Sequence, residues 1–598
     1  MGQGTKLFIA GLLALGLSAC GTDAGDDPID GENDGFATGK ADGALSPDSA
    51  EAAAVLALVN DPAVDFVELD DDARLHKTAA ANIIDHRDGP DGVPGTADDD
   101  TFDDLAELDA VKFVGPTALA QLLQYAIAHG YLDPNGGGGG VVAGDPSIDV
   151  IFSPQPSDAT HNAEVARLIG EAQHSIDVAM YSFSNAGVRN ALADAVARGV
   201  QVRVIFETAN EDRKLDGQDL LDSKSGELEQ LGMDVRYVNK IMHHKFMIVD
   251  GPRDDLSRAE TAIIASGSAN WSNSAGTRYD ENTLFLSGYP EMSLRMQQEF
   301  NHLWDHSRSF EAVAFPFVHS TATITEADIT DVADQHVYFT SANFDIGGTN
   351  TFKKTGRNEV GDQLVEAING ATDSIWVASG HLRLRSVAEA LMAKKAADPS
   401  IDIRVYLDGQ EYISEFFHND QTSDLEDCLA AASTPSQTNN CLDKGFLFGF
   451  AVGEAGIDVR YKYYSYRWHY TYAEQMHHKY LIIDGDELWT GSFNLSDNAL
   501  HNTMENMMNF RGDEFAALID AYEANFLGMW ETGRADDLLS DLRDEVENSN
   551  VVPLVFDAMA LTWDEVTSLK DLIRDNCPQI NSTDFRQHPE SHLVCEVN

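Results

Sequence analysis

One short string occurs twice in this chain of 598 residues, and it constrains the fold more than any other feature. Each copy reads His-His-Lys, four apolar or aromatic residues and Asp-Gly; Gly-Ser-x-Asn follows, and a Glu stands eleven residues after that Asn. Two matched sets of reactive side chains predict a duplicated domain and one active site assembled from two halves. The sets are His243, Lys245, Asp250, Ser268, Asn270 and Glu281, and His477, Lys479, Asp484, Ser492, Asn494 and Glu505.

The spacing inside each string separates its members by face. Residues two apart in a strand point the same way, so His243 and Lys245 share one face while His244 points to the other. Asp250 is seven residues past His243, which places it away from that His. We therefore expect Asp250 and its counterpart Asp484 to support the catalytic motif rather than to contact substrate directly.

The regions around the two strings have the same predicted element order. Alternating apolar strands and amphipathic helices are typical of an α/β fold. The Asp and the next motif Gly are seventeen residues apart in the first copy and seven in the second, so residues 252–258 predict a longer hairpin loop that reshapes the rim of the site. The first region has strands at 148–152, 176–181 and 200–206 and helices at 162–172 and 186–198; the second has strands at 337–339, 374–378 and 401–407 and helices at 360–368 and 386–395.

The residue types of the repeat suit phosphodiester transfer. Two Lys ammoniums and two Asn amides can hold the non-bridging oxygens and stabilise a pentavalent transition state. One imidazole can attack phosphorus, and the other can protonate the leaving oxygen and then deprotonate water. A carboxylate on the other ring nitrogen fixes each His tautomer, and Glu281 and Glu505 are the candidates. This chemistry needs no cofactor, and we expect no metal.

Two His-x-Lys-x4-Asp motifs, each followed by Gly-Ser-x-Asn, resemble the phospholipase D superfamily over residues 149–530. The resemblance implies two α/β sandwich domains with pseudo-twofold symmetry, at 148–320 and 335–533, in a monomeric catalytic unit. It also implies an active site at their interface and a metal-independent covalent mechanism. In that family pattern His243 is the nucleophile and His477 the general acid and base.

The N-terminus predicts export. Residues 1–20 contain Lys6 and then an apolar run from Leu7 to Leu17, which is a signal peptide pattern. Leu17-Ser18-Ala19-Cys20 resembles a bacterial lipobox, so we expect Cys20 to carry lipid and to anchor the protein to the cell envelope, at the outer membrane. The alternative is an ordinary secretory signal. Residues 21–48 are rich in Gly and Asp and predict a flexible acidic tether.

The remaining four cysteines form two pairs that are local in sequence. An oxidising compartment favours disulfides, which predicts Cys428–Cys441 and Cys577–Cys595. The chain has no Cys-x-x-Cys pair and so gives no support to a zinc site.

Residues 49–133 predict a small helical module, followed by a Gly-rich linker at 134–147. Residues 78–123 resemble a helix-hairpin-helix module, whose hairpin amides bind a nucleic-acid phosphate. Here Phe113 replaces the first hairpin Gly and the surroundings are acidic, which favours a structural or protein-contact role. The Asp-rich residues 88–100 lack EF-hand spacing and are better explained as a solvated turn than as a calcium site. Residues 534–598 predict a separate helical appendix.

Charge bears on the substrate. The net charge of −59 disfavours a nucleic-acid partner, because such binders usually carry a basic stripe. Together with the lipid anchor, it favours phospholipid headgroup diesters, or another small phosphodiester, as the substrate. The alternating aromatic residues of 464–472 suit a lipid surface, nucleic-acid bases or an ordinary edge strand. An endonuclease of the same superfamily is the alternative, and a non-enzymatic surface binding protein is a third.

Overall fold

The computed structural model describes residues 146–313, 319–348, 350–411, 415–463 and 475–531 without gaps, together with parts of 50–126 and 543–596. Cys20, the tether, Phe113 and the aromatic residues of 464–472 lie outside the described residues, as do Asp91, Asp98 and Asp99 of the Asp-rich turn. Within the part of the chain that is described, no helix combines the length and the apolar character needed to cross a membrane.

Two eight-stranded sheets dominate the structure, in the orders β1-β8-β7-β6-β2-β3-β4-β9 and β10-β21-β18-β17-β13-β15-β16-β23. In each sheet three parallel strands adjoin an antiparallel group, so the predicted duplication of an α/β unit is present. The first sheet comprises β1 (Ser147–Ser153), β2 (Ser175–Met180), β3 (Gln201–Phe206), β4 (Asp234–Tyr237), β6 (Lys245–Val249), β7 (Ile263–Gly267), β8 (Glu281–Ser287) and β9 (Arg308–Ser309). The second comprises β10 (Gln335–Phe339), β13 (Ser374–Ser379), β15 (Asp402–Asp408), β16 (Asp458–Tyr463), β17 (Lys479–Ile483), β18 (Glu487–Gly491), β21 (Asn506–Arg511) and β23 (Met559–Thr562).

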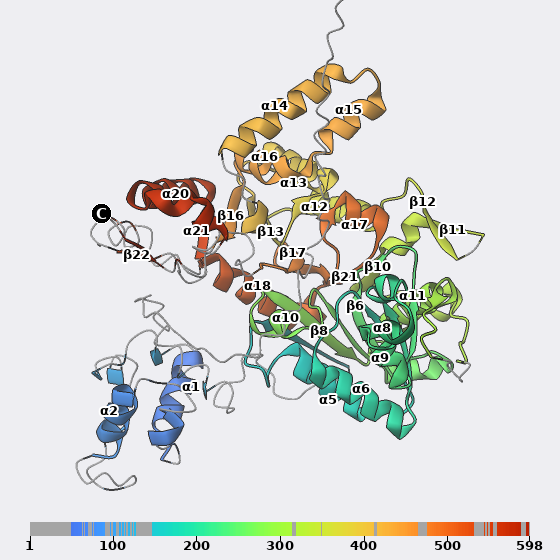
Figure 1. Ribbon diagram of the computed structural model, residues 1–598, viewed down its shortest axis with the longest axis horizontal. Coiled ribbons are helices and arrows are strands. Elements are labelled where there is room, and N and C mark those ends of the chain that lie inside the picture. The colour runs from blue at the N-terminus through green and yellow to red at the C-terminus, as the bar shows by residue number, and fades with distance from the viewer. Residues whose placement is uncertain are drawn as a thin grey trace, which may run out of the picture. The chain divides into compact units, whose positions relative to one another are not determined.

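Helices cover the outer faces of the sheets and fill the space between them (Figure 1). Because successive strand residues face opposite ways, Met247 of β6 packs in the outer core of the first half, while Phe246 and Ile248 pack in a central core shared by both halves. The two halves therefore bury one common apolar surface. The outer helices are α5 (His161–Glu171) and α6 (Ala186–Arg198) in the first half and α12 (Glu359–Gly370) and α13 (Arg385–Ala397) in the second; the central ones are α11 (Pro290–Asp305) and α18 (Ala516–Glu531).

The C-terminal region is not the separate appendix expected for 534–598. β23 pairs antiparallel with β16 and forms the edge of the second sheet, and α20 (Trp563–Asn576) packs beside it. The capping box that Thr562 and Glu565 form at the start of α20 is present as the sequence predicts. The composition of residues 534–598 does not show this pairing, in which the backbone of β23 forms hydrogen bonds with the edge strand β16.

Both expected disulfides are present. Cys428–Cys441 joins α14 (Glu415–Ala431) to α15 (Pro435–Leu442), in the stretch inserted before the second motif. Cys577–Cys595 joins the end of α20 to β24 (Val594–Glu596), which pairs with β22 (Val551–Pro553).

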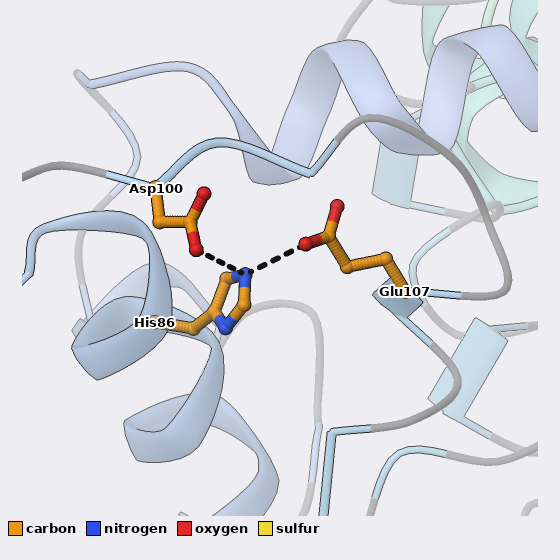
Figure 2. Close-up of side chains that lie close together, drawn as sticks. All are labelled: His86, Asp100 and Glu107. Carbon is orange, nitrogen blue, oxygen red and sulfur yellow. Dashed lines mark ion pairs between the residues drawn. The ribbon is translucent and has the colours of Figure 1, made fainter.

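The N-terminal module has its own apolar core around α1 (Ala50–Val59) and α2 (Lys77–Arg87). At the end of α2, buried Arg87 forms an ion pair with Asp88 at 2.6 Å and donates to two loop carbonyls, so Asp88 has a structural role. Figure 2 shows His86 beside Asp100 and Glu107, with its Nε2 at 3.9 and 3.5 Å from their carboxylate oxygens. Among the described residues this is the one group of three side chains spaced to share a metal ion.

Candidate active site

Backbone pairing between the two halves positions both catalytic histidines. β5 (Ile241–Met242) of the first half pairs in parallel with β20 (Thr503–Met504) of the second, and Asp280 bridges Met476. As a result, the His243 amide donates to the carbonyl of Met504, at 3.1 Å, and the His477 amide donates to the carbonyl of Asp280, at 2.9 Å. Each His therefore lies next to the Glu of the opposite half.

The two His–Glu pairs are formed crosswise. His243 Nδ1 lies 2.8 Å from the Glu505 carboxylate, and His477 Nδ1 lies 2.7 Å from that of Glu281. Both carboxylates are fully buried. A buried carboxylate on Nδ1 selects the tautomer that carries its proton there and leaves Nε2 available for chemistry. Each half thus supplies one imidazole and the carboxylate that orients the other.

The lysines of the two motifs lie beside their own histidines. Lys245 Nζ is 3.2 Å from His243 Nε2 and donates to the carbonyl of His243 at 3.0 Å. Lys479 Nζ donates to the carbonyl of His477 at 2.7 Å. The two ammonium groups, one beside each motif histidine, form a cationic centre that can hold the oxygens of a phosphodiester.

The motif serines orient the site and are buried away from solvent. Ser268 Oγ accepts from the Asn282 amide at 2.9 Å, and Ser492 Oγ accepts from the Asn506 amide at 3.0 Å. These bonds tie each Gly-Ser-x-Asn turn to the start of the next core strand, β8 or β21, where the motif Glu lies. Of the two roles expected for these serines, phosphate contact and orientation, the geometry fits orientation.

Asn270 and Asn494 occupy the ends of the same turns, so the structure brings both to the motif cluster. The carbonyl of Asn270 is held by His161 Nε2 of α5 at 2.9 Å. Burial lowers the pKa of His161 to about 4, against a smaller raising effect of this hydrogen bond, so the ring is neutral and donates from Nε2. His161 could not be singled out from the repeat, because the second half has no histidine at the corresponding position.

Asp250 and Asp484 lie at the ends of β6 and β17 that are remote from the histidines. Asp250 accepts from the amides of Gln173, His174 and Ser175 at 2.6–2.9 Å. Asp484 accepts from the amides of residues 372–374 at 2.7–3.0 Å. Both Asp residues have positive φ, 49° and 54°. This supporting arrangement is the one that strand parity predicts.

The second His of each string forms a cross-half contact that sequence reasoning missed. His244 Nδ1 lies 3.2 Å from Asn506 Nδ2, and His478 Nδ1 lies 3.0 Å from Asn282 Nδ2. All four side chains are fully buried. The signal was present in the repeat, since each Asn directly follows the catalytic Glu in both copies.

The field of the site shifts two pKa values. Burial, then the nearby Lys479 and Lys245 ammoniums, holds the pKa of His477 well below its usual range, with smaller contributions from His243 and His381. Burial raises the pKa of Glu505 to about 7, although Lys245 and two hydroxyl donors oppose that shift. Both groups therefore respond to the charge of a bound anion.

The long loop after Asp250 does not reach the rim of the site, contrary to expectation. It joins the ends of β6 and β7 that are remote from His243. Its Arg253 is buried and pairs with Asp177, which also accepts from Arg203 at 2.7 Å. The loop thus contributes a second arginine to a buried ion network around Asp177.

Comparisons with known proteins assign two regions of the chain to one family. Residues 165–304 and 364–530 match the family model described as the PLD-like domain of cardiolipin synthase. The chain is 30% identical over 139 residues to the mitochondrial cardiolipin hydrolase of Chlamydomonas reinhardtii, covering 23% of this chain and 54% of that protein. It is 34% identical over 139 residues to that of Danio rerio, covering 23% and 53%. It thus spans about half the length of these two curated relatives.

Among solved structures, a phospholipase D family member, Nuc from Salmonella typhimurium, aligns with a TM-score of 0.23 and 24% identity, covering 28% of this chain and 98% of that one.

Proposed function

Since this chain belongs to the phospholipase D-like family, we propose that it is a phosphodiesterase that hydrolyses phospholipid headgroup diesters through a phosphohistidine. The observation that carries the proposal is the crosswise pair of His–Glu contacts, His243–Glu505 and His477–Glu281, with a lysine beside each His. Neither half of the chain contains both members of a His–Glu pair, which is the arrangement expected of a single site with two imidazoles.

In the first step His243 acts as the nucleophile. Glu505 holds the Nδ1 proton, so the Nε2 lone pair attacks phosphorus and a P–N bond forms. The P–O bond to the headgroup breaks, and His477 Nε2 protonates the leaving oxygen. Phosphatidyl remains on His243 and the headgroup leaves as an alcohol.

In the second step His477, now neutral, acts as the base. It accepts a proton from water, the water oxygen attacks phosphorus, and the P–N bond to His243 breaks. Phosphatidate leaves and His477 is again protonated. Glu281 keeps the His477 ring in one tautomer through both steps.

Charge stabilisation comes from the chain itself in this proposal. Lys245 and Lys479 lie beside the two histidines, where their ammoniums can donate to the non-bridging oxygens of a phosphodiester and offset the negative charge of the transition state. A bound diester anion also offsets the field of these lysines, which raises the pKa of His477 toward the range a general acid needs. The mechanism requires no metal.

Three observations support a lipid substrate. The curated relatives with which the chain aligns are named cardiolipin hydrolases. The net charge of −59 opposes a long polyanion. The N-terminal signal and Cys20 would place the enzyme at the envelope, lipid-anchored and next to phospholipid. The endonuclease remains the competing activity.

Purified protein lacking residues 1–20 would be assayed with phosphatidylcholine, phosphatidylethanolamine, cardiolipin and single-stranded DNA, with and without EDTA. Lipid turnover that persists in EDTA is the expected result. Cleavage of DNA without lipid turnover would establish the endonuclease instead, and complete loss of activity in EDTA would refute the metal-free mechanism. His243→Asn and His477→Asn should each abolish activity; a substantial rate in either would refute one shared site.

A further inference from the structure

The two halves differ in the residues that follow β2 and β13, beside the two motif histidines. The amide of Tyr181, which follows β2, donates to the carbonyl of His244 at 3.1 Å. The amide of Gly380, which follows β13, donates to the carbonyl of His478 at 3.2 Å. Because these bonds are equivalent, Tyr181 and Gly380 occupy corresponding positions, and so do the next residues, Ser182 and His381.

In the first half an aromatic ring covers the catalytic imidazole. The Tyr181 and His243 ring centroids are 4.7 Å apart, and Lys245 Nζ lies 5.3 Å from the Tyr181 ring. The His243 side chain is only 1% exposed. This packing holds His243 in place and covers the face of its ring on the Tyr181 side.

At the corresponding position of the second half there is no such ring. Gly380 has no side chain, and a Cβ built there would meet the carbonyl oxygen of Met476 at 2.9 Å and the Cα of His477 at 3.9 Å. The His477 side chain is 17% exposed, far more than that of His243. The open side of the site is therefore the side of the general acid.

A third imidazole–carboxylate pair lies at this open side. His381 Nδ1 is 2.9 Å from Glu411 Oε1, and the His381 side chain is 16% exposed. Its imidazole is near enough to His477 to contribute to the lowered pKa of that residue, after burial and the larger effects of Lys479, Lys245 and His243. The first half lacks this pair, because Ser182 occupies the position of His381. Glu207 and Asp408 correspond, since each accepts from the amide that precedes its motif His. Counting three residues on from each places Asn210 at the position of Glu411.

The partners of Glu411 define what His381 can present. Arg383 also donates to Glu411 Oε1, at 2.9 Å from Nε. Burial alone would raise the pKa of Glu411, but the hydrogen bond and charge of His381, followed by those of Arg383, hold it below its ordinary value. The carboxylate is thus ionised and its charge is already balanced by Arg383. With Nδ1 directed at Glu411, Nε2 is the ring nitrogen of His381 that is left to contact a substrate group.

We propose that His381 is a specificity-determining residue that binds the leaving headgroup by accepting a hydrogen bond at Nε2 from a hydroxyl or ammonium of that group. This rests on the proposed function, in which the headgroup leaves on the His477 side. Headgroups with a donor, such as glycerol or ethanolamine, satisfy His381. Choline has no donor on its quaternary ammonium and leaves Nε2 unpaired, which a site built for a hydrogen bond disfavours.

The test compares kcat/KM for phosphatidylglycerol, phosphatidylethanolamine and phosphatidylcholine in the wild type and in His381→Ala, with Ser182→Ala as the matched control from the first half. In His381→Ala we expect kcat/KM to fall about tenfold more with the two donor headgroups than with phosphatidylcholine. His381→Gln, which keeps an acceptor, should restore part of the preference. A loss with phosphatidylglycerol alone would identify a hydroxyl as the group that His381 binds. A loss with phosphatidylethanolamine alone would identify the ammonium. Equal losses on all three lipids, or no loss on any, would overturn the proposal.

A second readout separates this idea from the lipid assignment. With bis(p-nitrophenyl) phosphate as substrate, an alcohol bound in the headgroup position can attack phosphorus in place of water: its oxygen bonds to phosphorus, the P–N bond breaks and its proton goes to His477. The ratio of transfer to hydrolysis should be higher with glycerol than with 1-propanol, and His381→Ala should remove that difference. If no lipid is cleaved but this difference depends on His381, the lipid proposal fails and the subsite stands. A difference that survives in His381→Ala refutes the subsite.

Discussion

Replacing Glu505 by Gln tests the crosswise assembly of the site most directly. Glu505 belongs to the second half but orients His243 of the first. Gln has the same shape and donates from its amide nitrogen, so the His243 tautomer that it favours carries the proton on Nε2. The nucleophilic lone pair is then turned away from phosphorus. Glu281→Gln does the same to His477, and each variant therefore disables a residue of the opposite half.

The size of the effect follows from the role of the carboxylate. An amide in place of the carboxylate that orients a catalytic His costs about 10⁴-fold in kcat, which corresponds to about 5 kcal/mol of transition-state stabilisation. The fold should not suffer. Burial raises the pKa of Glu505 to about 7 from an ordinary 4.5, so between these values the folded protein retains a proton that the unfolded chain loses, and stability falls as pH rises through that window. Glu505→Gln removes this cost and should be at least as stable as the wild type at pH 8.

A chromogenic diester with a good leaving group separates the two variants, because p-nitrophenolate needs no general acid. Stopped-flow traces of Glu505→Gln should show neither a burst nor turnover. Those of Glu281→Gln should show a burst of one equivalent and then stall, because the phosphohistidine forms on His243 but His477 cannot activate water. Peptide mapping of the trapped protein should find the label on His243. The opposite pattern, with the burst in Glu505→Gln, would mean that His477 is the nucleophile or that each Glu serves its own half.

Three further predictions follow from other contacts. Asp250→Ala removes the acceptor of three backbone amides and should lower the free energy of unfolding by about 2–4 kcal/mol in urea denaturation, while the folded fraction keeps its kcat. Asp250→Asn tolerates the positive φ and should lose less stability. An equal loss in the two variants would contradict the backbone role. Asp177→Asn leaves Arg203 and Arg253 facing a neutral amide and should cost about 3–5 kcal/mol by the same measurement, with a wild-type value counting against the buried network. Binding of inorganic phosphate at pH 7 should take up protons, because the anion offsets the lysine charge that lowers the pKa of His477. Calorimetry in buffers of different ionisation enthalpy measures this uptake. The uptake should be smaller in His477→Asn, where Glu505 still responds, and an unchanged uptake would count against the role of His477.

The fold and the residues of the candidate site could be predicted because both follow from local patterns in the sequence. Strand periodicity placed β1, β2 and β3 and their counterparts, and parity assigned Asp250 to a supporting role. It did not reveal which Glu serves which His, since spacing within one half carries no information about contacts between halves. That pairing is decided by the backbone bond from His243 to Met504, a contact between residues 261 apart in the chain, as 504 − 243 gives.

Other differences have physical causes of the same kind. The sequence predicts a surface hairpin loop at residues 252–258. Arg253 is instead buried, because it forms an ion pair with Asp177 in the buried network. The appendix expected at 534–598 joins the second sheet because the exposed edge of β16 accepts another strand. The sequence alone did not single out His381, because its role depends on its position next to Gly380, where the first half has Tyr181.

The contrast between Tyr181 and Gly380 removes a degeneracy inherent in two equal halves. In a perfectly symmetric pair either imidazole could attack, and a substrate could lie across the site in two opposite directions with equal energy. Half of the binding events would then present the wrong ester bond for cleavage. One aromatic ring on one side and none on the other give the site a polarity, so a single chain with two divergent halves can commit every bound substrate to the same orientation.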